Sequence, residues 1–207
     1  MFSKLQYISQ GDTVEQQLYN IHQALDHGCD WIQLRFKNGN LHSDLVLAEA
    51  VKILCEKYQA TFIINDKVYL TKEINADGVH LGLTDMKIQE ARKILGNRKI
   101  IGGTANTLED VLQRIKERCD YIGLGPFRFT TTKEELSPIL GFDGYRTLID
   151  QLSDQDLETP IYAIGGIRPD DIEALLNIGI YGIAVSGIIT QAPQLITQLN
   201  EKLYVNF

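Results

Sequence analysis

The chain contains few of the residues that mark secreted, zinc-binding or disordered proteins. Its 207 residues include three cysteines, five prolines and one tryptophan. Cys29, Cys55 and Cys119 are odd in number and too widely spaced for a zinc-ligand motif. We therefore expect reduced thiols in a cytoplasmic protein.

Long apolar runs and an excess of positive charge are also absent from the sequence. No run approaches the roughly 20 apolar residues that span a bilayer, and Met1–Gln6 lacks the apolar core of a signal peptide. The formal net charge of −7 disfavours a general binder of nucleic acid or of anionic membranes. An anionic small substrate would therefore need a local basic cluster. The sequence leaves open a homo-oligomer.

The chain alternates short apolar segments with amphipathic helical patterns. We expect strands at Leu5–Ile8, Trp31–Leu34, Thr61–Ile64, Gly78–His80, Ile100–Gly103, Tyr121–Leu124, Ile161–Ile164 and Gly182–Val185. The clearest helical patterns are Val14–Asp26, Ser43–Tyr58, Leu108–Arg118 and Pro169–Ile178. Strict alternation predicts a parallel sheet, and eight βα units is the number that closes a TIM barrel. We expect one (β/α)8 domain over residues 1–207.

Smaller signals agree with this architecture. Thr107 is expected to cap a helix with Asp110 three residues on, and Pro169 suits a first helical position. The segments Cys29–Leu34 and Cys119–Leu124 are weak copies of each other, and Ala76–Leu81 is a third. A period of two βα units favours closure, although any buried strand after a helix has a similar pattern.

A basic segment follows the second expected strand. Gln33, Arg35 and Lys37 alternate and would share one face of an extended chain. Such a face can clamp an anion, because Arg offers a planar fork and Lys a point charge. A solvated strand end is the other interpretation.

Acidic residues follow the third and fourth expected strands. Asn65 and Asp66 end one strand, and Asp85 comes shortly after the next. Two carboxylates on one rim suit Mg²⁺, which prefers oxygen ligands. A turn at Asn65-Asp66 and a helix N-cap at Asp85 are the alternatives. We interpret His80, inside an apolar strand, as a hydrogen-bonded core residue.

Glycine-rich connections follow the later strands. Gly165-Gly166 and Ser186-Gly187 come after the seventh and eighth, where such barrels often bind phosphate. The connection at 102–107 suits a phosphate contact or a plain turn. The long connection from Pro126 to Gly141 contains Thr130-Thr131-Thr132-Lys133 and is either a functional loop or a surface loop. Together these features predict a barrel enzyme that handles phosphate and diphosphate.

Several of these motifs, in order along nearly the whole chain, resemble the thiamine-phosphate synthase family. They are Ile32–Lys37, Ile64–Asp66, Gly78–Asp85, Gly123–Pro126, Thr130–Lys133, Ile164–Ile167 and Ala184–Ser186. The resemblance implies a transferase of thiamine biosynthesis. That enzyme joins hydroxymethylpyrimidine diphosphate to a carboxylated or decarboxylated thiazole phosphate, forming thiamine phosphate and diphosphate.

The resemblance also implies roles for individual residues. The pyrimidine diphosphate would contact Gln33, Leu34, Arg35, Phe36, Lys37, Asn65, Thr104 and Lys133. The thiazole phosphate would contact Thr130, Thr131, Thr132, Gly166, Val185 and Ser186. Asp66 and Asp85 would bind Mg²⁺, and Arg35, Lys37 and Lys133 would be catalytic because they stabilise the leaving diphosphate.

This chain departs from the family pattern at four places. Leu83 replaces a common glutamine, Thr104 a serine, and Asn106 a frequent histidine, while Phe127–Phe129 replaces Ile-Phe-Pro. Arg128, within that last segment, either reshapes the loop or adds a cation. A thiazole tautomerase, which uses histidine where this chain has Asn106 and lacks an equivalent of Asp85, is one alternative. A non-catalytic binder of thiamine-pathway phosphates is the other.

Overall fold

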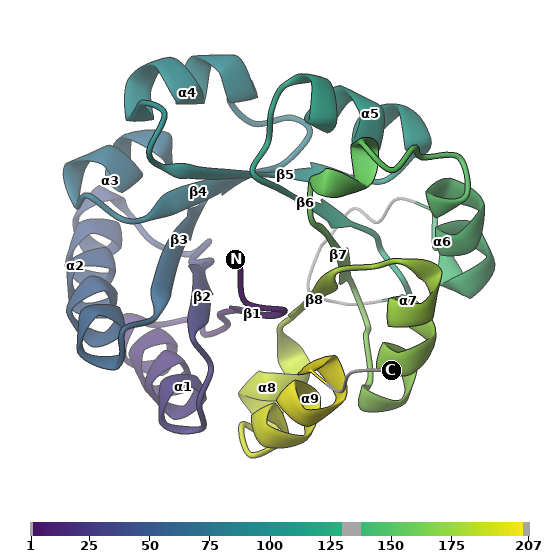
Figure 1. The fold of residues 1–207 in the computed structure, drawn as a ribbon. Helices are drawn as coiled ribbons and strands as arrows, with labels where there is room; N and C mark the ends of the chain where they lie inside the picture. Colours follow the sequence, from purple (N-terminus) through teal and green to yellow (C-terminus); the bar gives the residue numbers. More distant parts are fainter. Residues whose placement is uncertain (1, 130–137, 205–207) are drawn as a thin grey trace.

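Eight parallel strands form a closed barrel in the computed structural model, which describes residues 2–129 and 138–204 (Figure 1). The strands are β1 Leu5–Ile8, β2 Trp31–Leu34, β3 Thr61–Asn65, β4 Gly78–Leu81, β5 Ile100–Ala105, β6 Tyr121–Leu124, β7 Ile161–Ile164 and β8 Gly182–Val185. Each strand pairs with its neighbour in sequence, and β8 pairs with β1. The expected barrel is confirmed.

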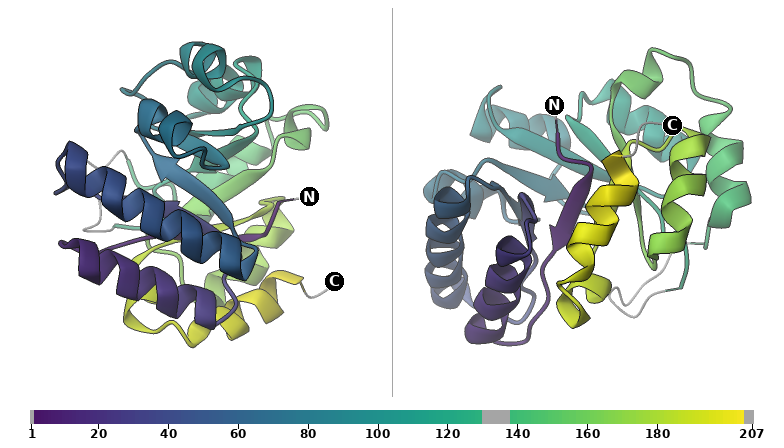
Figure 2. Two further views of the ribbon diagram at one scale, coloured as in Figure 1. Left: turned by 90° about the vertical axis from the view of Figure 1, so that its left-hand side faces the viewer. Right: turned by 60° about the horizontal axis from the view of Figure 1, so that its bottom comes forward.

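Helices form the outer ring of the barrel. They are α1 Val14–Asp26, α2 Leu41–Tyr58, α3 Val68–Glu73, α4 Ile88–Leu95, α5 Leu108–Lys116, α6 Gly141–Ile149, α7 Ile172–Ile178, α8 Gly187–Gln191 and α9 Leu195–Tyr204, with 3₁₀ turns η1 Asp156–Glu158 and η2 Pro169–Asp171. Figure 2 shows α1 and α2 lying side by side along one flank. Among the described residues, no helix has the length and apolar character needed to cross a membrane.

The sequence signals for helix ends are largely confirmed. Thr107 caps α5, with its hydroxyl accepting the Asp110 N–H at 3.2 Å and the Asp110 carboxylate accepting the Thr107 N–H at 3.0 Å. Pro169 opens a 3₁₀ turn rather than an α-helix, and α7 begins only at Ile172. The α2 helix begins two residues before the expected Ser43, because Asn40 caps it.

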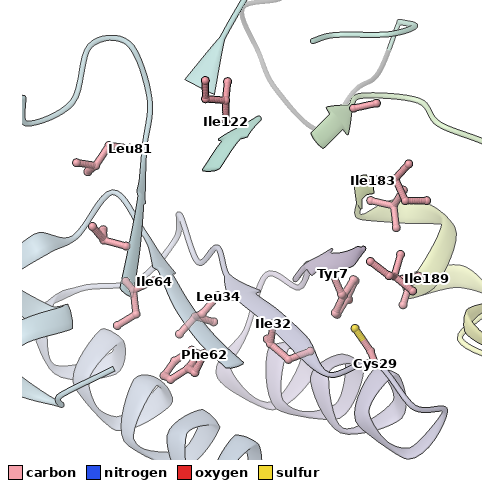
Figure 3. Packing of buried hydrophobic residues seen from close by; sticks show 14 of the residues in the cluster. Tyr7, Cys29, Ile32, Leu34, Phe62, Ile64, Leu81, Ile122, Ile183 and Ile189 are labelled. Atoms are coloured by element: carbon pink, nitrogen blue, oxygen red, sulfur yellow. The ribbon is translucent and has the colours of Figure 1, made fainter. Parts of the chain in front are cut away.

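Every second strand residue packs outward against the helices. Figure 3 shows this layer, in which Ile32 and Leu34 of β2 lie among residues such as Phe62 and Ile64 of β3. The opposite set of side chains points into the barrel. This alternation decides which strand residues can reach a ligand at the barrel mouth.

Aromatic side chains fill the amino-terminal half of the barrel interior. The ring centroid of Trp31 lies 5.0 Å from that of Tyr121 and 5.3 Å from that of Tyr162. Phe2, just before β1, stacks on Trp31 at 5.2 Å. Because the rings pack this end of the interior, a ligand that enters the barrel does so from the opposite, carboxyl-terminal mouth.

The internal sequence repeat has a structural explanation at the amino-terminal rim. The carboxylate of Asp77 accepts the N–H of Phe62 at 2.8 Å, and that of Asp120 accepts the N–H of Ile101 at 2.7 Å. Asp77 and Asp120, two of the three aspartates in the repeat, therefore bond to the preceding strand of the barrel. The repeat marks a device for joining adjacent strands rather than a site of chemistry.

Candidate active site

The polar residues singled out in the sequence lie at the carboxyl ends of the strands. Gln33, Asn65, His80 and Thr104 belong to β2, β3, β4 and β5 and alternate with the outward-facing layer. The register pairs Asn65 with His80 and Thr104 with Gly123 across adjacent strands. One mouth of the barrel thus collects polar groups from successive strands, as the sequence predicted.

The basic segment leaves β2 in a loop held by two polar side chains. The Ser9 hydroxyl accepts the N–H of Arg35 at 3.0 Å, and the Gln17 amide donates to the Arg35 carbonyl at 3.1 Å. Arg35 is half-buried and Lys37 is exposed. Both termini of the Arg35 peptide unit are therefore anchored, which limits where its guanidinium can reach.

The side chains of Gln33 and Leu34 lie on opposite sides of the barrel wall. Gln33 is 1% exposed inside the barrel, and its Nε2 has no hydrogen-bond partner within residues 2–129 and 138–204. A buried donor without a partner is costly unless a ligand supplies one. Leu34 and Phe36 are instead buried in the layer between strands and helices, so only their main chain can contact a ligand at the mouth.

Lys67 contacts both the loop that follows β2 and the carboxylate of Asp44. Its Nζ lies 2.6 Å from Oδ2 of Asp44 and donates to the carbonyl of Phe36 at 3.2 Å. A cavity of about 200 Å³ lies here, and it is lined by both Arg35 and Asp66. Lys67 thus holds the loop after β2 against the turn after β3. This contact keeps Arg35 and Asp66 on the same cavity.

Asp66 and Asp85 come together at this mouth. The Asp85 carboxyl lies close enough to that of Asp66 to affect its ionisation, and the pKa of Asp66 is raised from 3.8 to about 7. Loss of water around the carboxyl is the largest cause, followed by the hydrogen bond and the charge of Asp85, while Arg35 and Lys37 oppose the rise. Asp66 still keeps an exposed surface, so water weakens each of these effects.

The turn interpretation of Asn65-Asp66 also holds. Asp66 adopts a φ of 65°, and its N–H donates to the carbonyl of His80 at 2.9 Å. Aspartate tolerates this left-handed conformation better than most residues. The turn and the proposed metal site are therefore one feature, because the turn aims the carboxylate at the mouth.

The helix-cap interpretation of Asp85 is wrong. The α4 helix begins at Ile88, and its N-cap residue is Lys87. The Asp85 Oδ2 instead accepts the N–H of Gly82 at 2.6 Å within the same loop. A Cβ at Gly82 would lie 2.8 Å from that oxygen, so glycine allows the carboxylate to fold back this closely.

This pair of carboxylates fits Mg²⁺ by the chemistry of its donors. Two carboxyl groups in contact repel when both are ionised, and a cation or a proton relieves that repulsion. Mg²⁺ is typically held by one or two carboxylates plus water and substrate phosphates. Among the described residues there is no cluster of three or more His, Cys, Asp or Glu suited to a metal, so a fully protein-built cage is absent from that part of the chain.

His80 is confirmed as a hydrogen-bonded interior residue. Its Nδ1 lies 3.0 Å from the Tyr121 hydroxyl, which also accepts from the Gln6 amide at 3.2 Å. Its Nε2 lies 3.0 Å from the Thr104 hydroxyl. In the tautomer with its proton on Nε2, His80 accepts from the Tyr121 hydroxyl and donates to the Thr104 oxygen. The Thr104 proton is then available to a ligand at the mouth.

The glycine-rich turns after β7 and β8 lie on the same rim. Gly165 and Gly166 have φ values of 92° and 69°, conformations that favour glycine. Val185 is buried in the outer layer, so it can contact a ligand only through its main chain. The Ser186 hydroxyl donates to the carbonyl of Ile8 at 2.6 Å and ties β8 to β1.

Other predicted residues have different outcomes. Thr130, Thr131, Thr132 and Lys133 lie outside the described residues. Leu83 is exposed in the loop before Asp85.

The Asn106 amide donates to the carbonyl of Gly125, which joins the ends of β5 and β6. Arg128 does not supply a free cation, because it is paired with Asp171.

Arg114 is the main site residue that the sequence interpretation missed. It is 6% exposed on α5, and its guanidinium donates to the carbonyls of Gly82 and Thr104 at 3.0 Å each. A Cβ at Gly103 would lie 2.7 Å from the arginine Cδ, so the absence of that carbon lets the side chain pass. The sequence did indicate its burial, because Arg114 stands three residues after Val111 and so lies on the apolar face of the helix.

Comparison with known proteins agrees with this geometry. The profile of the family described as "Thiamine monophosphate synthase" matches residues 5–189. The chain is 63% identical to a thiamine-phosphate synthase of Flavobacterium johnsoniae over 209 residues, covering 100% of this chain and 99% of that protein. It is also 63% identical over 206 residues to one from Flavobacterium psychrophilum, with 98% and 100% covered.

A solved structure has the same fold over almost its whole length. Thiamine phosphate pyrophosphorylase from Pyrococcus furiosus superposes with a TM-score of 0.81 at 28% sequence identity. The match covers 97% of this chain and 96% of the other. The similarity therefore extends over all eight βα units.

Proposed function

Because the chain belongs to the thiamine monophosphate synthase family, we propose that its reaction takes place at the carboxyl-terminal mouth around Asp66 and Asp85. The activity is that of a thiamine-phosphate synthase, a transferase of thiamine biosynthesis. The proposed substrates are hydroxymethylpyrimidine diphosphate and a thiazole phosphate. Both are small phosphorylated molecules, as the basic and glycine-rich segments of the mouth require.

The mouth divides into two sides in this proposal. The pyrimidine diphosphate lies over β2 to β5, where Gln33, Asn65 and Thr104 offer polar groups and Arg35 and Lys37 offer charge. The thiazole phosphate lies over β7 and β8. There it contacts the amides of the Gly165-Gly166 turn and the main chain of Val185 and Ser186. Thr130–Lys133 stays a prediction for both.

The reaction breaks one bond and forms one bond. The carbon–oxygen bond between the pyrimidine methylene and the diphosphate breaks, and its electron pair leaves with the diphosphate. The lone pair of the thiazole nitrogen then forms the new carbon–nitrogen bond. No proton has to move at that nitrogen, so the site needs no general base.

Charge stabilisation is the main task of the side chains. Negative charge grows on the departing diphosphate, and Arg35 and Lys37 lie close enough to Asp66 to act on the same region. Asp66 and Asp85 would hold Mg²⁺, which when bound neutralises diphosphate oxygens as a Lewis acid. The Thr104 hydroxyl donates to the pyrimidine or its diphosphate, because His80 occupies one lone pair of its oxygen.

The observation that carries this proposal is the contact between Asp66 and Asp85 within reach of two cations. A protein that only bound thiamine-pathway phosphates would gain nothing from two carboxylates that repel an anion. A tautomerase would require a histidine at 106, whereas Asn106 is used to join β5 to β6. Both alternatives are therefore less well supported than the synthase.

Turnover of the purified protein tests the proposal directly. With both substrates and Mg²⁺, we expect thiamine phosphate and diphosphate in equal amounts, and EDTA should abolish their formation. Lys133→Ala should lower turnover by on the order of a hundredfold, with the exposed Lys57→Ala as a control of equal charge. Metal-independent turnover, or none with either form of the thiazole, would contradict the proposal.

A further inference from the structure

An ion pair joins the loops that follow β6 and β7. Arg128 lies in the loop after β6, and Asp171 ends the 3₁₀ turn η2 after β7. The Arg128 Nη2 donates to Oδ1 of Asp171 at 2.6 Å, and Nη1 donates to Oδ2. The Asp171 side chain is only 7% exposed. This is a two-pronged contact, the geometry in which arginine binds carboxylate most strongly.

The same arginine also bonds to the glycine turn of the candidate phosphate site. Its Nη1 donates to the carbonyl of Gly166 at 3.1 Å, and its main-chain N–H donates to the carbonyl of Gly165 at 2.9 Å. From the other side, Asp171 accepts the N–H of Arg168 at 2.7 Å. Arg128 and Asp171 together therefore hold both ends of residues 165–168.

The two loops are packed as closely as glycine permits. A Cβ at Gly166 would lie 2.7 Å from Cβ of Arg128, and a Cβ at Gly165 would lie 2.9 Å from Cβ of Pro126. Because neither glycine could carry a side chain here, the position of the turn depends directly on the position of the loop. The direction of its amide N–H groups depends on the same contact.

Arg128 is not available as a cation for the phosphate itself. Burial would raise the pKa of Asp171, but hydrogen bonds from the Arg128 guanidinium and the Arg168 N–H lower it below its usual value. The hydrogen bond to Asp171 likewise raises the pKa of Arg128. The remaining face of the guanidinium lies 4.5 Å from the Phe127 ring centroid. Its two terminal nitrogens and its charge are already engaged within the protein.

We propose that Arg128 and Asp171 are positioning residues for the phosphate monoester of the thiazole substrate. They fix the amides of residues 165–167 in the orientation that receives the phosphate dianion. The inference rests on the proposed function and adds to it a residue pair that sets the affinity for one substrate only. It predicts that disturbing the pair separates the kinetics of the two substrates.

The test varies each substrate in turn with the variant Arg128→Gln. We expect the KM for thiazole phosphate to rise by on the order of tenfold, because the amides lose their alignment. The KM for the pyrimidine diphosphate and kcat should stay within about twofold of wild type, a split expected of lost ground-state binding. Arg98→Gln makes the same chemical change at an exposed arginine before β5 and should leave both constants unchanged.

Two further variants test the pair as a unit. Arg128→Lys should behave like Arg128→Gln, because a lysine cannot span both oxygens of Asp171 and the Gly166 carbonyl. Asp171→Asn should raise the same KM, and the double variant should be no worse than either single one. Additive effects of the two substitutions would overturn the proposal, as would an equal rise of KM for both substrates or no change at all.

Direct binding keeps this result separate from the proposed reaction. Calorimetry with thiazole phosphate alone should show weaker binding by Arg128→Gln and normal binding by Arg98→Gln, whether or not turnover occurs. A wild-type protein that binds thiazole phosphate but lacks turnover would contradict the proposed function and not this inference. Equal binding by both variants would overturn the inference even in an active enzyme.

Discussion

Arg114 and Gly82 are joined by a hydrogen bond of 3.0 Å between a guanidinium and a carbonyl oxygen. Arg114 comes from α5, whereas Gly82 directly follows β4 and donates its own N–H to Asp85. A buried cation thus supports the loop that carries a proposed metal ligand. Since the same guanidinium also bonds to the Thr104 carbonyl, it connects two parts of the candidate site.

Arg114→Met should destabilise the fold. It leaves Glu117, whose side chain is 11% exposed and lies 3.0 Å from the guanidinium, without its charged partner. Breaking such a pair typically costs about 3 kcal/mol in the free energy of unfolding. Urea denaturation measures this, and adding Glu117→Leu should recover part of the loss. Equal stability of Arg114→Met and wild type would show that the network is not structural.

Asp66→Asn and Asp85→Asn should each lower turnover by on the order of a hundredfold. Each keeps the size of the side chain but removes a charge that Mg²⁺ requires. Diphosphate release measured over a range of Mg²⁺ concentrations should also show that both variants need more metal. Asp154→Asn, at an exposed loop position, provides the matched control. Unchanged metal dependence in both variants would rule out this pair as the metal site.

Thr104→Val should lower kcat/KM for the pyrimidine diphosphate by on the order of tenfold. The valine keeps the shape but removes the proton that the hydroxyl offers at the mouth. Thr104→Ser keeps that proton and should remain close to wild type. Steady-state kinetics with the pyrimidine substrate varied will decide, and an equally active valine variant would mean that the hydroxyl serves only His80.

The three cysteines should be unreactive in the folded protein. Burial raises the pKa of Cys29, Cys55 and Cys119 from 9.0 to about 12. Because the thiolate is the reactive form and almost none is present at pH 8, labelling of the folded protein should be slow. A thiol reagent such as DTNB should label three cysteines in urea, whereas in buffer it should label none of them rapidly. Rapid native labelling would contradict the burial of these side chains.

Some residues could be placed correctly from the sequence because their signal is local. The alternation of β2 predicted that Gln33 and Leu34 face opposite ways, and the structure has one inside the barrel and the other outside. The carbonyl and carboxylate contacts of Arg114 and Arg128 have no such local signal. Apart from Glu117, which lies one turn after Arg114, their partners are between 10 and 43 residues away in sequence and meet them only when the barrel closes.

The amino-acid sequence by itself determined the eight βα units, the barrel and the strand ends where polar groups gather. It could do so because strand period, helix caps and turn residues act over a few positions. Only the tertiary structure decided that Asp85 does not cap α4 and that Asp66 lies beside Asp85. It also decided that Arg128 forms an ion pair with Asp171. Those outcomes depend on burial and on contacts between strands distant in sequence, and neither is encoded in any short segment of the chain.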